Sequence, residues 1–240
     1  MKLGTQIGSV KIDDLITEKI DTRINEIMQH RRPDDLPECG MPADSKPMKT
    51  GWYKWMLSRY IFSTQFTEGK TVLDLCCGVG WGSYIIGTNA KKIIAVDYQK
   101  KALEYLKNNW KNTKNIETVN FDVLKYVCKE PVDIVLMMDC IEHLSIFEGV
   151  RVMLNVFKSL KPDGIVIGSS GFPATREQAK KSESKFHKHV YTLNEITMLL
   201  KTFFKDVKVL ENKYFICKEK KLWCDQWTIF YYQTKRQFTL

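Results

Sequence analysis

From residue 70 onward, short apolar runs alternate with stretches of helical periodicity. Helical spacing recurs between the runs at residues 82–88, 99–109 and 147–160, and again at 193–204. This alternation is typical of parallel strands joined by helical crossovers, so the pattern predicts an α/β fold with a doubly wound, mostly parallel sheet. The runs are nearly wholly apolar, as strands buried on both faces should be. The expected strands are residues 71–75, 92–96, 116–120, 132–137, 165–169, 207–211 and 228–233.

The first 66 residues follow a different pattern. Apolar residues recur at three- and four-residue steps between residues 12 and 28, which predicts an amphipathic helix. Four prolines within residues 30–49 exclude a continuous helix and predict an extended loop. Helical spacing resumes at residues 52–66, which are rich in aromatic side chains. We therefore expect residues 1–66 to form N-terminal helices with a proline-rich lid, and residues 67–240 to form the α/β domain with a polar insertion near 172–190.

Composition and charge limit the class of protein. The chain has 240 residues, of which 44% are hydrophobic and 27% are charged, so a normal globular core is expected. No apolar run is long enough for a membrane span and the first residues lack an apolar signal core, so we expect a cytoplasmic protein without a membrane partner. The formal net charge of +9 favours anionic partners. Because the lysines are scattered along the chain, a solvated surface is favoured over a nucleic-acid footprint.

A glycine-rich turn follows the first expected strand, in the segment TVLDLCCGVGWGS at residues 71–83. The strand carries Asp74 near its end, and Gly78, Gly80 and Gly82 precede a helix. Glycines at such a turn allow a ligand to lie against the main chain and the helix N-terminus. The segment therefore predicts a site for a nucleotide-like cofactor.

Later strands of the predicted sheet also end in acids. Asp97 follows the second strand, 23 residues after Asp74, where a carboxylate can accept both ribose hydroxyls. Asp122 follows the third strand and Asp139 follows the fourth. Because the carboxyl ends of parallel strands meet at one edge of a sheet, these acids strengthen the cofactor prediction.

Residues 59–168 resemble the class I S-adenosylmethionine-dependent methyltransferases, whose cofactor loop reads VLDLxCGxGxG. The segments DCIEHL at 139–144 and LKPDG at 160–164 are also similar to this family. The resemblance implies a Rossmann-like, seven-stranded fold, S-adenosyl-L-methionine as cofactor and S-adenosyl-L-homocysteine as product. One departure is Cys76, which stands where the family most often has glycine.

The same resemblance implies roles for individual residues at the cofactor site. Asp74, Gly78 and Gly80 would cradle the methionine moiety, and Asp97 would hold the ribose. Asp122 would contact the adenine, with Phe121 or Val123 flanking the ring. The complete set of implied cofactor-binding residues is Asp74, Cys76, Gly78, Gly80, Asp97, Tyr98, Phe121, Asp122, Val123 and Asp139.

A Rossmann dehydrogenase would share the glycine-rich turn and the ribose acid. The GxGxxG spacing of that class is absent, since the segment reads GVGWG. The charge of Asp74 also opposes a dinucleotide pyrophosphate and favours a cofactor with sulfonium and ammonium groups. The methyltransferase interpretation is therefore preferred.

Three histidines are candidates for the catalytic residues. His143 follows the fourth strand, where an imidazole could remove a proton from the methyl acceptor; the alternative is that it caps or packs the next helix. His187 and His189 lie at the end of the polar insertion, directly before an expected helix. The alternative for His189 is that it orients the turn at Thr192, whose spacing to Glu195 predicts a capping box.

Two classes of function remain. The first is methyl transfer to a hydroxyl, or an amine, of a small molecule such as a sugar or secondary metabolite. The second is RNA-directed methylation, suggested by the basic charge and by the lysine- and aromatic-rich segments 52–60 and 213–227. A non-catalytic cofactor-binding module ranks third. No metal is predicted, because Asp139 alone does not form the acidic cluster of a metal-assisted methyltransferase. The oligomeric state is not predicted.

Overall fold

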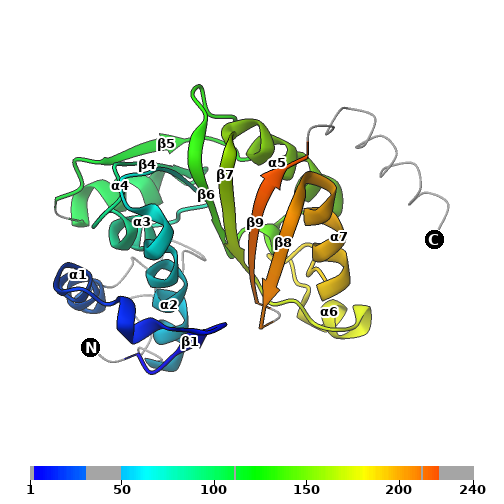
Figure 1. Cartoon of the computed structure of the whole chain (residues 1–240), viewed down its shortest axis with the longest axis horizontal. Helices are drawn as coiled ribbons and strands as arrows, with labels where there is room; N and C mark the ends of the chain where they lie inside the picture. Colours follow the sequence, from blue (N-terminus) through cyan, green and yellow to red (C-terminus); the bar gives the residue numbers. More distant parts are fainter. Residues whose placement is uncertain (1–2, 31–49, 111, 212, 222–240) are drawn as a thin grey trace. The chain divides into compact units, whose positions relative to one another are not determined.

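The computed structural model describes residues 3–30, 50–110, 112–211 and 213–221 (Figure 1). The chain divides into two compact units, Met1–Val123 and Leu124–Leu240, and each is described by itself. The proline-rich segment at 31–49, expected to act as a lid, and the strand expected at 228–233 lie outside the described residues. The boundary expected at residue 66 stays a prediction.

The first unit begins with short elements. The strands β1 (Gln6–Ile7) and β2 (Val10–Lys11) pair antiparallel and lead into a short 3-10 helix, η1 (Ile12–Leu15). The helix α1 (Glu18–Gln29) follows. The expected helix at 12–28 is thus interrupted, because Thr17 is extended and its side chain caps α1 by accepting a hydrogen bond from Ile20 N.

The sheet of the first unit is parallel, in the order β5–β4–β3. Its strands are β3 (Thr71–Leu75), β4 (Lys92–Asp97) and β5 (Ile116–Asn120). The crossover helices are α3 (Trp81–Ile86) and α4 (Lys100–Asn109), and α2 (Thr50–Thr67) packs on α3. Asp97 pairs with Asn120 in the register, so the ends of β4 and β5 are level at the edge where ligands bind in such sheets.

The second unit contains four strands in the order β6–β7–β9–β8. They are β6 (Val132–Met138), β7 (Leu160–Ser169), β8 (Phe204–Leu210) and β9 (Tyr214–Lys220). β6 and β7 are parallel, whereas β9 is antiparallel to both β7 and β8. Residues 161–164 belong to β7, and the register between β6 and β7 shifts between Val132 and Ile134 as a bulge.

The helices of the second unit are α5 (Ile146–Ser159), α6 (Arg176–Ser182) and α7 (Leu193–Phe203), with the 3-10 helix η2 (Ile141–His143) after β6. α7 lies beside β8 in Figure 1. The capping box expected at the start of α7 is confirmed, since Thr192 Oγ1 accepts from Glu195 N at 3.2 Å and Glu195 Oε2 accepts from Thr192 N at 2.9 Å.

The predicted class of fold, a mostly parallel seven-stranded sheet flanked by helices, is confirmed over the described part of the chain. β9 was not expected, and it occupies part of a segment that the sequence suggested as a basic surface. Its apolar side chains Phe215 and Cys217 are fully buried, whereas its lysines lie toward the end of the strand. Among the described residues, no helix combines the length and the apolar character that a bilayer crossing requires.

Candidate active site

The turn between β3 and α3 has the backbone that the glycine-rich segment predicts. Cys76, Gly78 and Gly80 have positive φ angles of 59°, 54° and 74°. Gly80 is the N-cap of α3, and a Cβ placed on it would lie 2.1 Å from Leu106 Cδ1 in α4. Only glycine satisfies both the left-handed backbone and this close approach. Cys76 adopts the left-handed conformation without being glycine.

Asp97 ties the end of β4 to this turn. Its Oδ2 accepts a hydrogen bond from Gly78 N at 2.9 Å, and its Oδ1 accepts one from Gln99 N at 2.8 Å. Burial of the carboxyl raises its pKa, although the backbone hydrogen bonds from Gln99, Gly78 and Tyr98 act in the opposite direction. The carboxylate therefore fixes the shape of the turn. Its role in holding the ribose stays a prediction.

Asp74 is completely buried beneath the turn. Ser83 Oγ donates to its Oδ2 at 2.5 Å and the Tyr60 hydroxyl donates to its Oδ1 at 3.4 Å. Burial raises the pKa of Asp74 to about 7, and the two hydrogen bonds only partly offset that effect. Sequence reasoning singled out Asp74 but missed both of its partners. The approach of Tyr60 depends on Gly82, since a Cβ there would lie 2.1 Å from the tyrosine ring.

Aromatic side chains are exposed at the ends of β4 and β5. Tyr98 is 72% exposed and Phe121 is 45% exposed, while Asp122 is exposed and Val123 is half-buried. Phe121 N donates to Asp97 O at 3.0 Å, which holds the two strand ends together. Exposed rings beside a glycine turn and a buried carboxylate suit a ligand with a flat aromatic base. These residues of the first unit therefore fit an adenosyl cofactor.

Trp110 is a further support of the turn that sequence reasoning missed. It directly follows α4, and its indole Nε1 donates to Val79 O at 2.7 Å. Its ring stacks on Tyr84 of α3, with the ring centroids 5.2 Å apart. A buried tryptophan with a satisfied N–H thus connects the turn, α3 and the end of α4.

In the second unit, Asp139 lies at the end of β6 with a positive φ of 48°. Its N–H donates to Ser169 O at 2.9 Å, and Ser169 Oγ donates to its Oδ1 at 3.3 Å. The residue is half-buried. The structure thus places Asp139 at a strand end, as the sequence predicts, and its role in cofactor binding stays a prediction.

Two of the three candidate histidines lie side by side in the second unit. The ring centroids of His143 and His187 are 5.0 Å apart in an edge-on arrangement, and both residues are half-buried. His143 Nδ1 lies 3.0 Å from Phe186 O. Because a carbonyl only accepts, Nδ1 is the nitrogen that donates in this contact, and in the neutral ring Nε2 is then the acceptor. Glu142, which sequence reasoning did not single out, is buried and joins the two histidines: one ligand atom from each of the three lies within 4.8 Å of the others.

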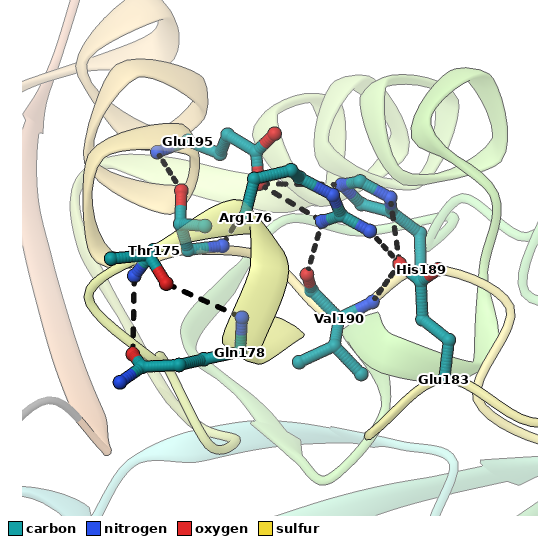
Figure 2. A network of polar contacts seen from close by, with 8 residues as sticks. Thr175, Arg176, Gln178, Glu183, His189, Val190 and Glu195 are labelled. Atoms are coloured by element: carbon teal, nitrogen blue, oxygen red, sulfur yellow. Dashed lines mark hydrogen bonds and ion pairs between the residues drawn. The ribbon is translucent and has the colours of Figure 1, made fainter. Parts of the chain in front are cut away.

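His189 lies in a different environment, a network of charged side chains shown in Figure 2. Its Nδ1 lies 3.5 Å from Glu183 Oε1 and its Nε2 lies 3.6 Å from Glu195 Oε2. The residue is only 8% exposed. These contacts favour a positioning role for His189, in line with the alternative raised from the sequence, and a catalytic role for it stays a prediction.

Arg176 at the start of α6 completes this network (Figure 2). Its guanidinium donates to Val190 O at 2.7 Å, to Glu195 Oε2 at 3.4 Å and to Glu183 Oε1. Burial opposes the charge on Glu195, but the Thr192 N–H and the neighbouring His189 and Arg176 hold its pKa below the usual range. The network therefore ties both ends of the polar insertion to the cap of α7, on either side of His187.

The chain is similar to known methyltransferases. Residues 72–164 match the family described as "Methyltransferase domain". A probable S-adenosylmethionine-dependent methyltransferase of Mycobacterium tuberculosis is 25% identical over 74% of this chain and 68% of the relative. A tRNA N(3)-methylcytidine methyltransferase of Schizosaccharomyces pombe is 26% identical over 60% of this chain and 53% of the relative.

Solved structures show the same fold. The N-methyltransferase NodS of Bradyrhizobium japonicum, in complex with S-adenosyl-L-homocysteine, aligns with 86% of this chain and all of its own, with a TM-score of 0.57 and 14% identity. The PH0226 protein of Pyrococcus horikoshii aligns with 71% of this chain and 92% of its own, with a TM-score of 0.58 and 20% identity. The solved structures show the class I methyltransferase fold, and the methyltransferase domain at residues 72–164 together with the curated relatives identifies the protein as an S-adenosylmethionine-dependent methyltransferase, with S-adenosylmethionine as its cofactor.

Proposed function

We propose that this enzyme methylates a hydroxyl, or an amine, of a small molecule such as a sugar or secondary metabolite in the cytoplasm. The observation that carries the choice of a hydroxyl acceptor is the hydrogen bond of His143. Its Nδ1 donates to Phe186 O, so in the neutral ring Nε2 is the nitrogen that can accept a proton. A hydroxyl acceptor needs such a base, whereas a neutral amine can be methylated before it loses a proton.

The cofactor supplies a methyl group on a positively charged sulfur. We propose that Gly78 and Gly80 receive its methionine moiety against the open backbone of the turn, while Asp97 accepts hydrogen bonds from the ribose. Tyr98 and Phe121 would flank the adenine, with Asp122 at its amine. The remaining proposed contacts come from Asp74, Cys76, Val123 and Asp139.

The role of the acceptor-side residues follows from the balance of the reaction. The carbon–sulfur bond breaks as the carbon–oxygen bond forms, and the acceptor hydroxyl loses one proton. We propose that this proton passes to His143 Nε2 and that His187, whose ring is edge-on to His143, contacts the acceptor. Because displacement at a methyl carbon requires alignment, holding the acceptor contributes as much as removing its proton.

The experiment is a transfer assay with S-adenosylmethionine labelled in the methyl group, offered separately to small-molecule extracts and to total RNA. We expect label in the small-molecule fraction and a mass gain of one methyl in its product. His143→Gln should lower turnover by about 10²-fold or more for a hydroxyl acceptor while the affinity for S-adenosylhomocysteine is unchanged. Full turnover of the variant would refute the role of His143 as a base.

RNA is the alternative acceptor, favoured by the net charge of +9 and by similarity to a relative named as a tRNA methyltransferase. Binding to RNA releases counterions, so it weakens steeply as salt is added. Label in the RNA fraction, together with salt-dependent retention of the protein on RNA, would replace the small-molecule proposal with this one.

A further inference from the structure

We propose that Glu142, His143 and His187 form a binding site for one divalent transition-metal cation of the Zn²⁺ type. A carboxylate and two imidazoles are donors that Zn²⁺ prefers, and three protein ligands are the set found in zinc sites that keep one position open. The site lies wholly in the second unit. The proposal goes beyond the proposed function, since it concerns ion binding with no cofactor or acceptor present.

Convergence of the three donors is the first observation. One ligand atom from each residue lies within 4.8 Å of the other two, although His187 is 44 and 45 positions away from the other two in the sequence. Ligand atoms around a tetrahedral Zn²⁺ lie roughly 3.3 Å apart when each bond is about 2.0–2.1 Å. Any pair of donor atoms near the 4.8 Å limit must approach on binding, and rotation of the His187 side chain, in the loop between α6 and α7, would bring its donor nearer.

The hydrogen bonding of His143 is the second, independent observation. Metal-bound histidines commonly donate their other ring N–H to a carbonyl or carboxylate, which fixes the ring and its tautomer. His143 meets this condition, since Nδ1 lies 3.0 Å from Phe186 O, and the bond joins it to the residue directly before His187. The two imidazoles are thus connected through the backbone at residue 186.

Burial and loop structure are the third observation. Glu142 is 7% exposed, so its carboxylate lies where attraction to a cation is weakly screened. The loop that carries His187 is closed by Ser184, whose Oγ accepts from His187 N and whose N donates to His187 O, both at 3.0 Å. An ion would therefore meet a loop whose backbone is already ordered by hydrogen bonds, and both imidazoles would serve as ligands. The base role proposed for His143 then applies to the ion-free enzyme.

The test uses the full chain without an affinity tag, stripped with a chelator and titrated with Co²⁺ as a spectroscopic substitute for Zn²⁺. We expect about one Co²⁺ to bind per chain and to give the visible absorption of a low-symmetry cobalt site. Added Zn²⁺ should displace the Co²⁺ and remove this absorption. Nitrogen and oxygen ligands give no thiolate-to-cobalt band in the near ultraviolet. Such a band would show that cysteines hold the ion and would overturn the proposal, as would the absence of saturable absorption.

Variants connect the signal to the cluster. Glu142→Gln and His187→Gln should each weaken Co²⁺ binding by at least about tenfold, because each removes a ligand. His30→Gln, in the first unit, is the matched control and should bind as the wild type does. Wild-type affinity in His187→Gln would overturn the proposal.

Folding is checked by the melting temperature, which Zn²⁺ should raise in the wild type and in His30→Gln but not in His187→Gln. His187 is half-buried in a loop, so this variant remains informative if Glu142→Gln does not fold. Calorimetry with S-adenosylhomocysteine separates the two proposals. Cofactor binding without Co²⁺ binding rejects only the metal site, and Co²⁺ binding without cofactor binding rejects only the enzymatic role.

Discussion

Single residues at the turn between β3 and α3 are constrained for different physical reasons. Gly80 needs both a left-handed backbone and the space beside Leu106, whereas Asp97 is fixed by two backbone N–H donors. The sequence predicted that both residues matter for the turn, because a glycine and an acid at these spacings have few other uses. The partners of Asp74 were not, because Tyr60 and Ser83 belong to separate helices and no sequence spacing connects their side chains with a strand end.

Gly80→Ala tests the constraint at the turn. The variant combines a positive φ with a Cβ 2.1 Å from Leu106, so we expect a loss of about 2–4 kcal/mol in the free energy of unfolding. Gly69→Ala is the matched control, since Gly69 has a φ of +66° with nothing within 4 Å of its Cβ, and should lose only about 1–2 kcal/mol. Urea denaturation measures both. Equal losses would show that the contact with Leu106 is unimportant.

The buried carboxyl of Asp74 predicts a pH dependence of stability. Its pKa is raised from 3.8 to about 7 in the folded protein, so the folded state holds the proton more tightly than the unfolded chain does. The contribution of Asp74 to the free energy of unfolding is therefore full below about pH 4 and falls as the pH rises toward 7. Above about pH 7 the protein has lost on the order of 4 kcal/mol of this contribution.

Asp74→Asn removes this titration. The free energy of unfolding of the variant should therefore increase relative to that of the wild type between about pH 5 and about pH 8. Urea denaturation at both pH values measures the difference. A difference between the two proteins that does not change with pH would contradict the raised pKa.

At the scale of elements, the parallel strands and most of the longer helices were predictable, whereas β9, the break before α1 and the polar insertion were not. β3 and β5 have the predicted bounds, although only β3 is largely buried, since β5 lies at the edge of the sheet and none of its residues is buried. α6 was missed because it has no apolar periodicity. Its stability comes from a capping box between Thr175 and Gln178 and from the buried Ala179, together with contacts of Arg176 to distant residues.

Arg176→Ala tests whether those contacts hold the insertion. We expect faster hydrogen exchange at the amides of residues 183–190, because the guanidinium donates to both Val190 O and Glu183 Oε1. Exchange in β3–β5 should be unchanged. Lys181→Ala is the control, since its ion pair with Glu177 is largely exposed and such pairs contribute little. Equal exchange in the two variants would refute the clamping role of Arg176.

At the scale of the whole molecule, we expect the binding of the cofactor or its product to stabilise the folded protein. S-adenosylhomocysteine should raise the melting temperature, because a ligand that binds only the folded protein stabilises it. Asp97→Ala should weaken the binding of S-adenosylhomocysteine by about tenfold or more. This is the loss expected when one charge-assisted hydrogen bond or two neutral hydrogen bonds are removed. Asp163→Ala, at an exposed acid in β7, is the control. Unchanged calorimetric affinity in Asp97→Ala would exclude its ribose role.

The sequence by itself determined the class of fold and marked a glycine-rich turn beside acids at strand ends, and its resemblance to a known family indicated the cofactor. The fold and the turn depend on local patterns, namely apolar periodicity and glycines at a strand end, which short-range sterics and burial translate directly into structure. Only the tertiary structure decided which histidines meet. His187 and His189 are two residues apart, yet one lies beside His143 and Glu142 and the other between Glu183 and Glu195. The conformation of the loop and the charged side chains beside it place the two histidines in different surroundings. Neither can be read from the spacing of residues in the sequence.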